Sequence, residues 1–424
     1  MAILETDVVV AGTGPGGATL ARELSRRQRS VVLLEKGRWH DMFVGRYLSV
    51  GPITRIVVPR GDFGIMARGV SVGGSTVVFT GNAYDPPPWL KTELGIDLSE
   101  EVAETRREID IKPLPDEFFG RWPGTRRLVE AAGDLGIEMK PQDKYVDPDR
   151  CDPDCDDCML GCRRGAKWTA REWAAQARAN GVRLLDRTTV DRVVFENGRA
   201  VGLKVRGPDG FEEVRADKVV LAAGGMGTPV ILLNSGVSGA GSHFFIDPMN
   251  VVWGLSRHDV GIGEQTFSVA SEDFMESDDF MIGNLGRLFL YHWAWLGRLR
   301  GYAFGGATGM FAKVGDSPGG SIDARGVIRK TYTAGDRAKF KKGTDICKKI
   351  MIRAGVVPGT LLVLPNVGGH PGGTAAIGKV VGPDLQVLGA ENLFVCDASV
   401  FPRSPGRPPS LTIIGLAKRL SKTL

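Results

Sequence analysis

The start of the chain has two short apolar runs, and the segment between them has apolar residues at helical spacing. Residues 7–11 and 31–35 are short apolar runs typical of buried parallel strands. Residues 18–27, between them, have the apolar spacing of a helix. The order and lengths of these segments predict a βαβ unit.

Regular patterns return later in the chain. Residues 190–195 and 200–205 predict a hairpin around Glu196-Asn197-Gly198, and residues 218–223 predict a strand. Near the end, residues 393–396 predict a strand and residues 411–420 an amphipathic helix with a basic end. Between residues 237 and 365 the pattern is irregular, with glycine and aromatic residues mixed and few long helical periods.

Length and composition narrow the class of protein. A chain of 424 residues is roughly two to three times the usual domain size, so we expect two domains with full cores. Its 58 glycines, about twice the average share, indicate many tight turns. The net charge of +5 comes from Lys and Arg spread along the chain, which argues against a nucleic-acid partner.

From the sequence pattern we expect neither an export signal nor a membrane span. The first seven residues lack a basic region followed by an apolar stretch, and no apolar run approaches the roughly 20 residues of a membrane span. We therefore expect a cytoplasmic protein, with peripheral contact to a membrane as the alternative.

The turn after the first predicted strand carries a glycine pattern, G-x-G-x-x-G, and the second strand ends in an acid. Gly12 permits a tight turn, Gly14 lets the backbone approach a pyrophosphate, and Gly17 allows the helix to pack closely on the strand. Glu35 can accept hydrogen bonds from a ribose diol. The predicted dinucleotide-binding residues of this turn are Gly12, Gly14, Pro15, Gly16, Gly17 and Glu35.

Four further segments resemble the glucose-methanol-choline (GMC) oxidoreductase family. They are residues 72–76 (Val-Gly-Gly-Ser-Thr), 222–229 (Ala-Ala-Gly-Gly-Met-Gly-Thr-Pro), 370–378 (His-Pro-Gly-Gly-Thr-Ala-Ala-Ile-Gly) and 392–402. The resemblance runs in order over residues 7–85, 188–235 and 366–424. The glycine pattern is shared by FAD and NAD sites, and the resemblance implies FAD.

The resemblance also implies a fold and a set of cofactor contacts. The expected fold is α/β, a Rossmann-like FAD-binding domain with an inserted smaller α+β substrate domain. We assign residues 1–235, including a cysteine-rich loop at 151–162, and residues 366–424 to the FAD-binding domain, and 236–365 to the substrate domain. Further cofactor residues implied are Gly73, Gly74 and Ser75 near the flavin ring, Val190 beside the adenine, Ala223 and Gly224, and Asp397 and Ala398 near the pyrophosphate and ribityl chain.

A histidine suits the base that takes a hydroxyl proton while flavin takes a hydride. The chain has five: His40, His243, His258, His292 and His370. The resemblance places His370 facing the flavin, so it is the predicted catalytic residue, with a structural role as the alternative. His243 is expected to order a loop at the domain junction.

One position departs from the family pattern. The family generally places a second His or Asn shortly before the last helix, where Pro408 stands here. Proline offers neither a side-chain donor nor a backbone N–H. The reverse reaction or another flavin reduction therefore stays open beside alcohol oxidation. The neighbouring Arg407 could orient an acidic or carbonyl group, although a solvent-facing salt bridge is the favoured role.

Four cysteines follow a compact C-x3-C-x2-C-x3-C spacing: Cys151, Cys155, Cys158 and Cys162. Such spacing favours the ligands of a four-iron (4Fe-4S) cluster, with zinc second and metal-free thiols or disulfides third. The following residues, 165–169, resemble a cysteine-rich subgroup of the family that includes long-chain alcohol oxidases. A cluster would carry electrons to a protein or quinone acceptor, or act only as a structural staple.

Residues 285–304 mix aromatic and apolar side chains with three arginines and predict a core helix, a substrate pocket or an interface. The leading functional hypothesis is an FAD-dependent alcohol dehydrogenase acting on an alcohol or carbonyl compound, with an apolar one favoured. The alternative is an electron-transfer or reductase subunit that oxidises no alcohol. A third hypothesis keeps FAD and zinc as structural elements. The oligomeric state stays open.

Overall fold

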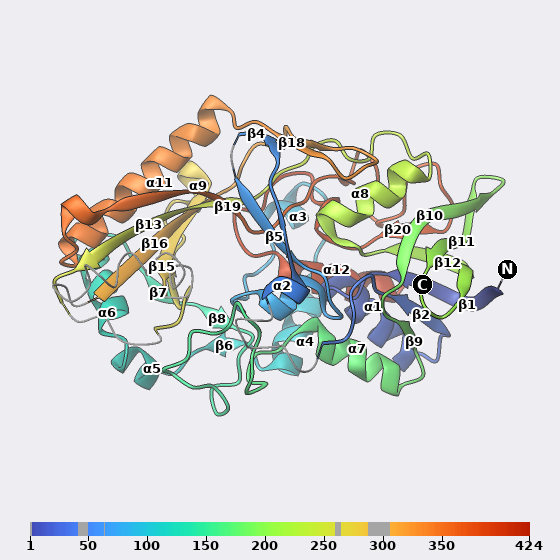
Figure 1. Cartoon of the computed structure of the whole chain (residues 1–424), viewed down its shortest axis with the longest axis horizontal. Helices are drawn as coiled ribbons and strands as arrows, with labels where there is room; N and C mark the ends of the chain where they lie inside the picture. Colours follow the sequence, from blue (N-terminus) through green and yellow to red (C-terminus); the bar gives the residue numbers. More distant parts are fainter. Residues whose placement is uncertain (1, 41–49, 63, 259–263, 287–305) are drawn as a thin grey trace.

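Two β-sheets lie towards opposite ends of an elongated molecule in the computed structural model (Figure 1). The structure describes residues 2–40, 50–62, 64–258, 264–286 and 306–424.

The first sheet lies at the end of the molecule where both chain ends are found (Figure 1). β1 pairs in parallel with β2 on one side and β12 on the other, so the carboxyl ends of these strands share one edge of the sheet. In spatial order the strands are β10 (Thr189–Glu196), β11 (Arg199–Arg206), β12 (Phe211–Leu221), β1 (Ala2–Ala11), β2 (Val31–Leu34) and β9 (Arg183–Leu185), with β20 (Leu393–Val395) paired to β12.

A layer of helices covers the first sheet. α1 (Pro15–Arg26) packs against α7 (Ala170–Ala179) and α12 (Ser410–Ser421), and α12 packs on α4 (Ser99–Ile109). α1 begins with Pro15, which is favourable because the first helical N–H has no partner within the helix. The predicted βαβ unit, hairpin, and C-terminal strand and helix are confirmed.

The second sheet draws its strands from three distant parts of the chain. In spatial order they are β3 (Thr54–Val57), β5 (Ile65–Gly69), β19 (Leu362–Gly368), β13 (Pro248–Ser256), β16 (Gly306–Val314), β15 (Phe280–Leu285), β14 (Val269–Ser271) and β7 (Lys140–Pro141). α11 (Ala334–Arg353) lies across β13, β15 and β16 (Figure 1). The extents of the two domains stay a prediction.

The interpretation of residues 237–365 as irregular, with few long helical periods, was wrong. The region contains two nine-residue strands, β13 and β16, and the 20-residue helix α11. The strands are buried on both faces, so they lack the alternation of polar and apolar residues that marks a half-exposed strand. α11 carries lysines and two glycines, which weaken its helical signal.

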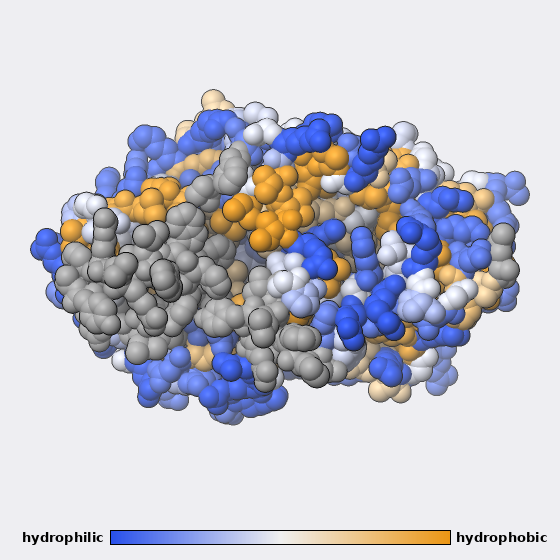
Figure 2. Space-filling model, in the orientation of Figure 1, coloured by the Kyte–Doolittle hydropathy of each residue, from blue (hydrophilic) through white to orange (hydrophobic). Residues whose placement is uncertain are grey.

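The second sheet has apolar side chains on both faces. Val252 and Ala312 face the core beneath α11. The other face holds an aromatic and methionine-rich cluster, made of Tyr84, Met249, Val251, Trp253, Phe267, Ala270, Met281, Leu285 and Phe311. Around β3 and β5 the chain also exposes the apolar side chains of Ile56, Val58 and Ile65. Figure 2 shows an apolar patch near the centre of the face of the molecule that it views.

Smaller elements complete the described chain. They are the sheet β17 (Ser321–Ile322), β18 (Ile328–Lys330) and β4 (Arg60–Gly61), the pair β6 (Lys112–Pro113) and β8 (Asp143–Lys144), the helices α2 (Val50–Ile53), α3 (Trp89–Thr92), α5 (Asp116–Gly120), α6 (Pro123–Gly133), α8 (Gly224–Asn234) and α9 (Met275–Asp278), and the 3-10 turns η2 (Gly74–Val78), η4 (Pro358–Thr360) and η5 (Ala398–Val400). Among the described helices, none combines the length and the apolar character needed to cross a bilayer.

Candidate functional site

The glycine turn between β1 and α1 is built so tightly that three of its positions, Gly12, Gly16 and Gly17, exclude any side chain. Gly12 has a φ of +110°, and a Cβ there would lie 2.3 Å from the carbonyl oxygen of Ala222. A Cβ on Gly17 would lie 1.9 Å from the carbonyl oxygen of Gly12. Gly14, in contrast, faces open space, with no atom within 4 Å of a Cβ.

Glu35, at the end of β2, is held by the turn itself. Its Oε2 accepts hydrogen bonds from the Thr13 hydroxyl at 2.6 Å and the Thr13 N–H at 3.1 Å, and its Oε1 accepts one from the Gly37 N–H at 2.7 Å. Burial raises the pKa of Glu35, although these hydrogen bonds oppose the shift. The carboxylate is therefore fixed beside the predicted pyrophosphate turn.

The segment predicted to face the flavin ring contacts this turn. The Gly73 N–H donates to the Thr13 hydroxyl at 3.0 Å. A Cβ on Gly74 would lie 3.0 Å from the Cα of Gly14, and the Ser75 hydroxyl accepts from the Gly69 N–H at 3.1 Å. The structure thus brings the first and second glycine segments together.

Asp397 joins the C-terminal segment to the start of α8. Its carboxylate accepts from the Gly224 N–H at 2.8 Å, the Thr228 hydroxyl at 2.5 Å and the Ser399 N–H at 2.8 Å. Burial raises its pKa against these hydrogen bonds. Ala223 precedes α8 directly, and its N–H donates to the Thr228 hydroxyl at 3.1 Å.

The N-terminus of α1 meets the same C-terminal segment. A Cβ on Gly16 would lie 1.9 Å from the carbonyl oxygen of Cys396, the residue before Asp397. Strand pairing does not bring Val190 to this turn, because β11 and β12 separate β10 from β1 in the sheet. The predicted cofactor residues other than Val190 therefore lie along two helix N-termini and the segments between them.

The turn fits the pyrophosphate of a dinucleotide on two grounds. The N-cap residue of α1 is Gly14, which makes no side-chain cap, so the N–H groups of the first turn that follow Pro15 are presented to whatever lies before the helix. The open space at Gly14 leaves room for a close approach. The individual cofactor contacts stay predictions.

His370 lies next to these segments. Its neighbours Pro371, Gly373 and Thr374 are anchored to them: a Cβ on Gly225 would lie 2.0 Å from the Pro371 carbonyl oxygen, the Gly373 N–H donates to the Ala398 carbonyl at 3.2 Å, and the Thr374 hydroxyl donates to the Gly225 carbonyl at 2.9 Å. These contacts hold the segment that contains His370 against the start of α8 and against η5.

The imidazole of His370 contacts buried charges that the sequence did not reveal. Its Nδ1 lies 2.8 Å from Asp247 Oδ2, and Lys313 Nζ lies 2.5 Å from the same oxygen. The side chains of Asp247 and Lys313 are fully buried, whereas 25% of the His370 side chain is exposed. Burial and the Lys313 charge lower the pKa of His370, and Asp247 opposes them. For Asp247, burial raises the pKa, but Lys313 and His370 outweigh it and the net shift is downward.

The other expectations around this site have mixed outcomes. Arg407, beside Pro408, pairs with Glu272 at 3.0 Å, so the expected salt bridge forms, but with only 16% of the Arg407 side chain exposed it does not face solvent as expected. His243 has a φ of +60° and lies 2.9 Å from the ammonium of Lys379. Residues 287–305, most of the aromatic and arginine-rich segment, and His292 lie outside the described residues.

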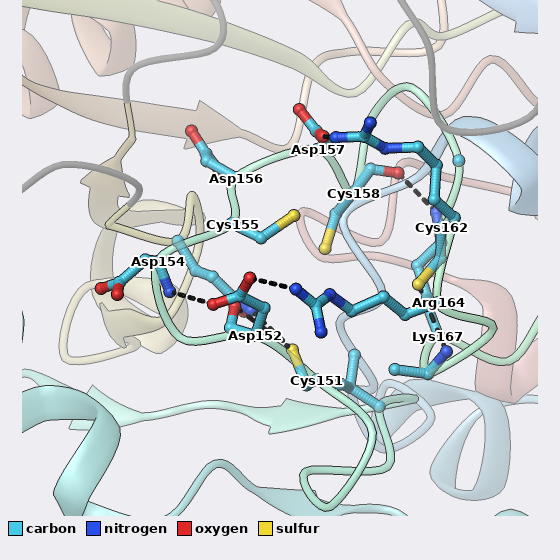
Figure 3. A pocket seen from close by; sticks show the side chains of 15 residues that line it. Cys151, Asp152, Asp154, Cys155, Asp156, Asp157, Cys158, Cys162, Arg164 and Lys167 are labelled. Carbon is cyan, nitrogen blue, oxygen red and sulfur yellow. Dashed lines mark hydrogen bonds and ion pairs between the residues drawn. The ribbon is translucent and has the colours of Figure 1, made fainter.

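The four cysteines of the compact motif line one pocket of about 470 Å³. Figure 3 shows their sulfur atoms turned towards one another, with Arg164 reaching into the same space. Cys151, Cys155, Cys158 and Cys162 form no disulfide. Burial raises the pKa of Cys151 to about 12 and that of Cys155 to about 11.

No group of three or more His, Cys, Asp or Glu side chains in the described residues has a geometry that could hold a metal ion. The predicted cysteine ligands thus share a pocket without converging as a zinc site requires. The 4Fe-4S cluster and the zinc expected from their spacing find no support in this geometry.

Two buried lysines beside the pocket were also missed from the sequence. Lys167 Nζ donates to the carbonyls of Cys158, Val77 and Phe79 at 2.5, 3.1 and 2.7 Å. Lys144 Nζ donates to the carbonyls of Thr80 and Thr266, both at 3.2 Å, and to Asn82 Oδ1 at 3.0 Å. Burial lowers the pKa of each to about 8.

Comparison with known proteins extends over most of the chain. The N-terminal and C-terminal models of the GMC oxidoreductase family match residues 7–266 and 329–417. An uncharacterized GMC-type oxidoreductase of Mycobacterium tuberculosis is 30% identical, over 98% of this chain and 75% of the relative.

Two more distant similarities also extend over nearly the whole chain. A long-chain-alcohol oxidase of Arabidopsis thaliana is 22% identical over 99% of this chain and 67% of its own. The crystal structure of pyridoxine 4-oxidase from Mesorbium loti superposes with a TM-score of 0.76 and 18% identity, covering 99% of each chain. This superposition agrees with the α/β fold expected from the sequence.

Proposed function

The chain belongs to the GMC oxidoreductase family, and from this membership we propose that it oxidises an alcohol to a carbonyl compound, with His370 as the base. As a family member it is an FAD-dependent oxidoreductase. The observation that carries the proposal is the contact of the His370 segment with Gly225 and Ala398, at the predicted cofactor residues Gly224, Asp397 and Ala398.

The proposed oxidation breaks one C–H bond and one O–H bond of the alcohol, and the hydride and the proton go to different acceptors. Bound FAD would accept the hydride from the carbinol carbon. His370 Nε2 takes the hydroxyl proton, and the oxygen keeps its electron pair to form the carbonyl. Glu35 and the N-termini of α1 and α8 would hold the cofactor. Pro408 supplies no donor to the substrate oxygen, so His370 is the group that we assign to it.

An apolar alcohol is the favoured substrate class. The aromatic and methionine-rich face of the second sheet reaches the histidine segment, because a Cβ on Gly369 would lie 4.0 Å from the methyl carbon of Met249. Such a surface favours an apolar substituent on the carbinol carbon. The similarity to a plant long-chain-alcohol oxidase agrees with this choice.

The test is anaerobic bleaching of the flavin absorbance by a panel of primary alcohols of increasing chain length. We expect His370→Ala to slow bleaching by about 10²- to 10⁴-fold while the FAD content is retained. His243→Ala is the control, since His243 lies 2.9 Å from Lys379 in an exposed pair. Bleaching by His370→Ala at the rate of the unchanged protein would refute the assignment.

A second candidate is electron transfer from flavin to a protein or quinone through an iron-sulfur cluster in the cysteine pocket. The contacts of Lys167 favour this electron-transfer candidate. Its ammonium donates to the carbonyls of Cys158, Val77 and Phe79, and the last two lie at the end of the predicted flavin-facing segment. Charge also favours this candidate, because Lys144 and Lys167 are buried beside the thiols and donate to backbone carbonyls and the Asn82 amide oxygen, with Asp156 as the carboxylate that acts on Lys144. An anionic thiolate centre would balance them.

Iron, zinc and flavin analysis of freshly purified protein tests this second candidate. About four irons per chain, lost in Cys158→Ser, would support a cluster. Cys347→Ser, a change of a cysteine on the buried face of α11, should leave the metal content unchanged. Zinc or no metal would remove the electron-transfer candidate and leave the alcohol oxidation intact.

A further inference from the structure

The side of His370 that faces into the protein is fixed by a chain of buried charged groups. Nδ1 lies 2.8 Å from Asp247 Oδ2, and the Lys313 ammonium contacts that oxygen at 2.5 Å and the Asp247 carbonyl at 2.7 Å. The Ser404 hydroxyl donates to Asp247 Oδ1 at 3.1 Å. Each carboxylate oxygen of Asp247 therefore has a donor.

We propose that Asp247 and Lys313 are positioning residues for His370, which keep the proton on Nδ1 so that Nε2 presents a lone pair to the substrate. The inference rests on the proposed function for its chemistry. The structural part of the proposal, that the Asp247 carboxylate sets one tautomer of His370, does not depend on which substrate is bound.

Asp247 selects the tautomer because a carboxylate only accepts hydrogen bonds. The Asp247–Nδ1 contact of 2.8 Å therefore requires a proton on Nδ1, and the neutral ring then has none on Nε2. Lys313 keeps the carboxyl ionised, since a buried carboxylate without a counter-charge would take up a proton. A protonated Asp247 could donate to Nδ1 and reverse the tautomer.

A second buried ion pair holds the backbone of Asp247 in place. Asp316 accepts from the N–H groups of Ile246 and Asp247, and Lys330 Nζ lies 2.6 Å from Asp316 Oδ2. Asp247 has a φ of +56°, a conformation that L-residues adopt at a cost. The Asp316–Lys330 pair therefore stabilises the strained residue that faces the imidazole.

The charges around the imidazole favour its neutral form. Lys313 repels an imidazolium and Asp247 attracts it, and with burial the net effect is a lowered pKa for His370. The charged groups facing this cluster from the packed elements are Asp247, Lys313, Asp316, Lys330, Asp279, Lys339 and Arg403. During the reaction Asp247 stays ionised and accepts from the imidazolium, while the substrate proton stays on Nε2.

Nitrogen NMR of histidine-labelled protein reads the tautomer directly. The chain has five histidines, so the His370 signals can be assigned by their loss in His370→Gln. We expect the Nδ1–H tautomer in the unchanged protein at neutral pH. An Nε2–H tautomer there would overturn the proposal without the use of any other variant.

Two variants separate the roles of the carboxylate and the ammonium. In Asp247→Asn we expect loss of the single tautomer and a fall in kcat of about 10²- to 10⁴-fold at unchanged FAD content. In Lys313→Met the hydrogen-bonded Asp247–His370 pair loses its buried counter-charge, so the pair should bind its next proton at higher pH, and the apparent pKa of the pair read from the His370 NMR signals should rise by roughly one unit. The acid limb of kcat/KM should move to higher pH by the same amount.

Lys418→Met is the matched control, because Lys418 is also buried and ion-paired, to Glu104 and Glu108, among the helices over the first sheet. It should leave the pKa and the tautomer of His370 unchanged. A Lys313→Met variant with an unmoved or lowered His370 pKa would contradict the proposal. If the NMR results hold but no alcohol bleaches the flavin, the proposed function fails and the positioning role stands.

Discussion

Gly14 and Gly17 lie three positions apart in the same turn but have opposite surroundings. A Cβ on Gly17 would collide with the carbonyl of Gly12, whereas a Cβ on Gly14 meets nothing within 4 Å. The need for glycine at Gly17 comes from the packing of the chain on itself. At Gly14 the described part of the fold leaves room for a side chain, so we expect a ligand to be what a side chain there would obstruct.

Substitution by alanine should separate these two causes. We expect Gly17→Ala to lower the free energy of unfolding of the FAD-free protein by about 1–3 kcal/mol, because a buried carbon is forced onto backbone. Gly14→Ala should change it by less than about 0.5 kcal/mol but weaken FAD binding at least about tenfold. Urea unfolding and titration with FAD measure the two effects. Unchanged FAD affinity in Gly14→Ala would place the pyrophosphate elsewhere.

At the residue scale, the sequence predicted the site residues that lie in short local motifs. It did not predict those that reach the site from distant parts of the chain. The glycine turn and His370 lie in short segments whose residue types indicate their chemistry. Asp247 and Lys313 lie 123 and 57 positions from His370, and nothing in their neighbouring residues indicates a pairing. Lys144 and Lys167 were missed for the same reason, since a buried lysine has the same sequence signal as an exposed one.

The helix α11 shows what glycine does within one element. Gly343 faces the second sheet, where a Cβ would lie 2.7 Å from the Cβ of Ala312. Gly335, in the first turn of the same helix, is exposed, and the nearest atom to a Cβ there is 3.6 Å away. One glycine permits close helix–sheet packing, and the other only weakens the helix.

Alanine at these two positions should therefore change stability in opposite directions. Gly335→Ala should raise the free energy of unfolding by about 0.5 kcal/mol through helix propensity and lower chain entropy. Gly343→Ala should lower it by about 1–2 kcal/mol, because overpacking exceeds the same helical gain. Thermal unfolding followed by circular dichroism measures both. Stabilisation by Gly343→Ala would show that α11 can move away from the sheet.

The elements themselves were predictable where they are regular and locally marked. β1, α1 and β2 have apolar runs of normal length and a glycine turn between them. β13 and β16 were missed because both of their faces are buried, beneath α11 and against the aromatic cluster, which removes the alternation that identifies a strand. The strands β3, β5 and β7 join the second sheet from early in the chain, a long-range pairing with no local signal.

At the scale of the molecule, one carboxylate ties three helices together. Glu108 of α4 contacts Arg22 of α1 at 2.6 Å, Arg26 of α1 at 3.0 Å and Lys418 of α12 at 2.9 Å. Burial acts to raise the pKa of Glu108, but the hydrogen bonds from Lys418, Arg22 and Arg26 outweigh it and lower the pKa to about 2. The stabilisation is therefore complete above the usual pKa of 4.5 and is lost as the pH falls towards about 2.

Removal of this charge should change the acid stability of the whole fold. We expect Glu108→Gln to lower the free energy of unfolding by about 2 kcal/mol at neutral pH, with a smaller difference at about pH 3. Glu104→Gln is the control, since this more exposed partner of Lys418 should contribute less than about 0.5 kcal/mol. Denaturant unfolding at the two pH values gives the comparison, and a difference independent of pH would contradict the role of the charge.

The position of Lys167 has a thermodynamic consequence. One ammonium group supports both the Cys158 loop and the end of the η2 segment, so ligands at these two places share a common support. Linkage then requires reciprocity: if an occupant of the cysteine loop changes flavin affinity by some factor, flavin changes the affinity for that occupant by the same factor. If an occupant of the cysteine loop strengthens flavin binding, loss of that occupant through damage to the thiols would lower the flavin content before any turnover is measured.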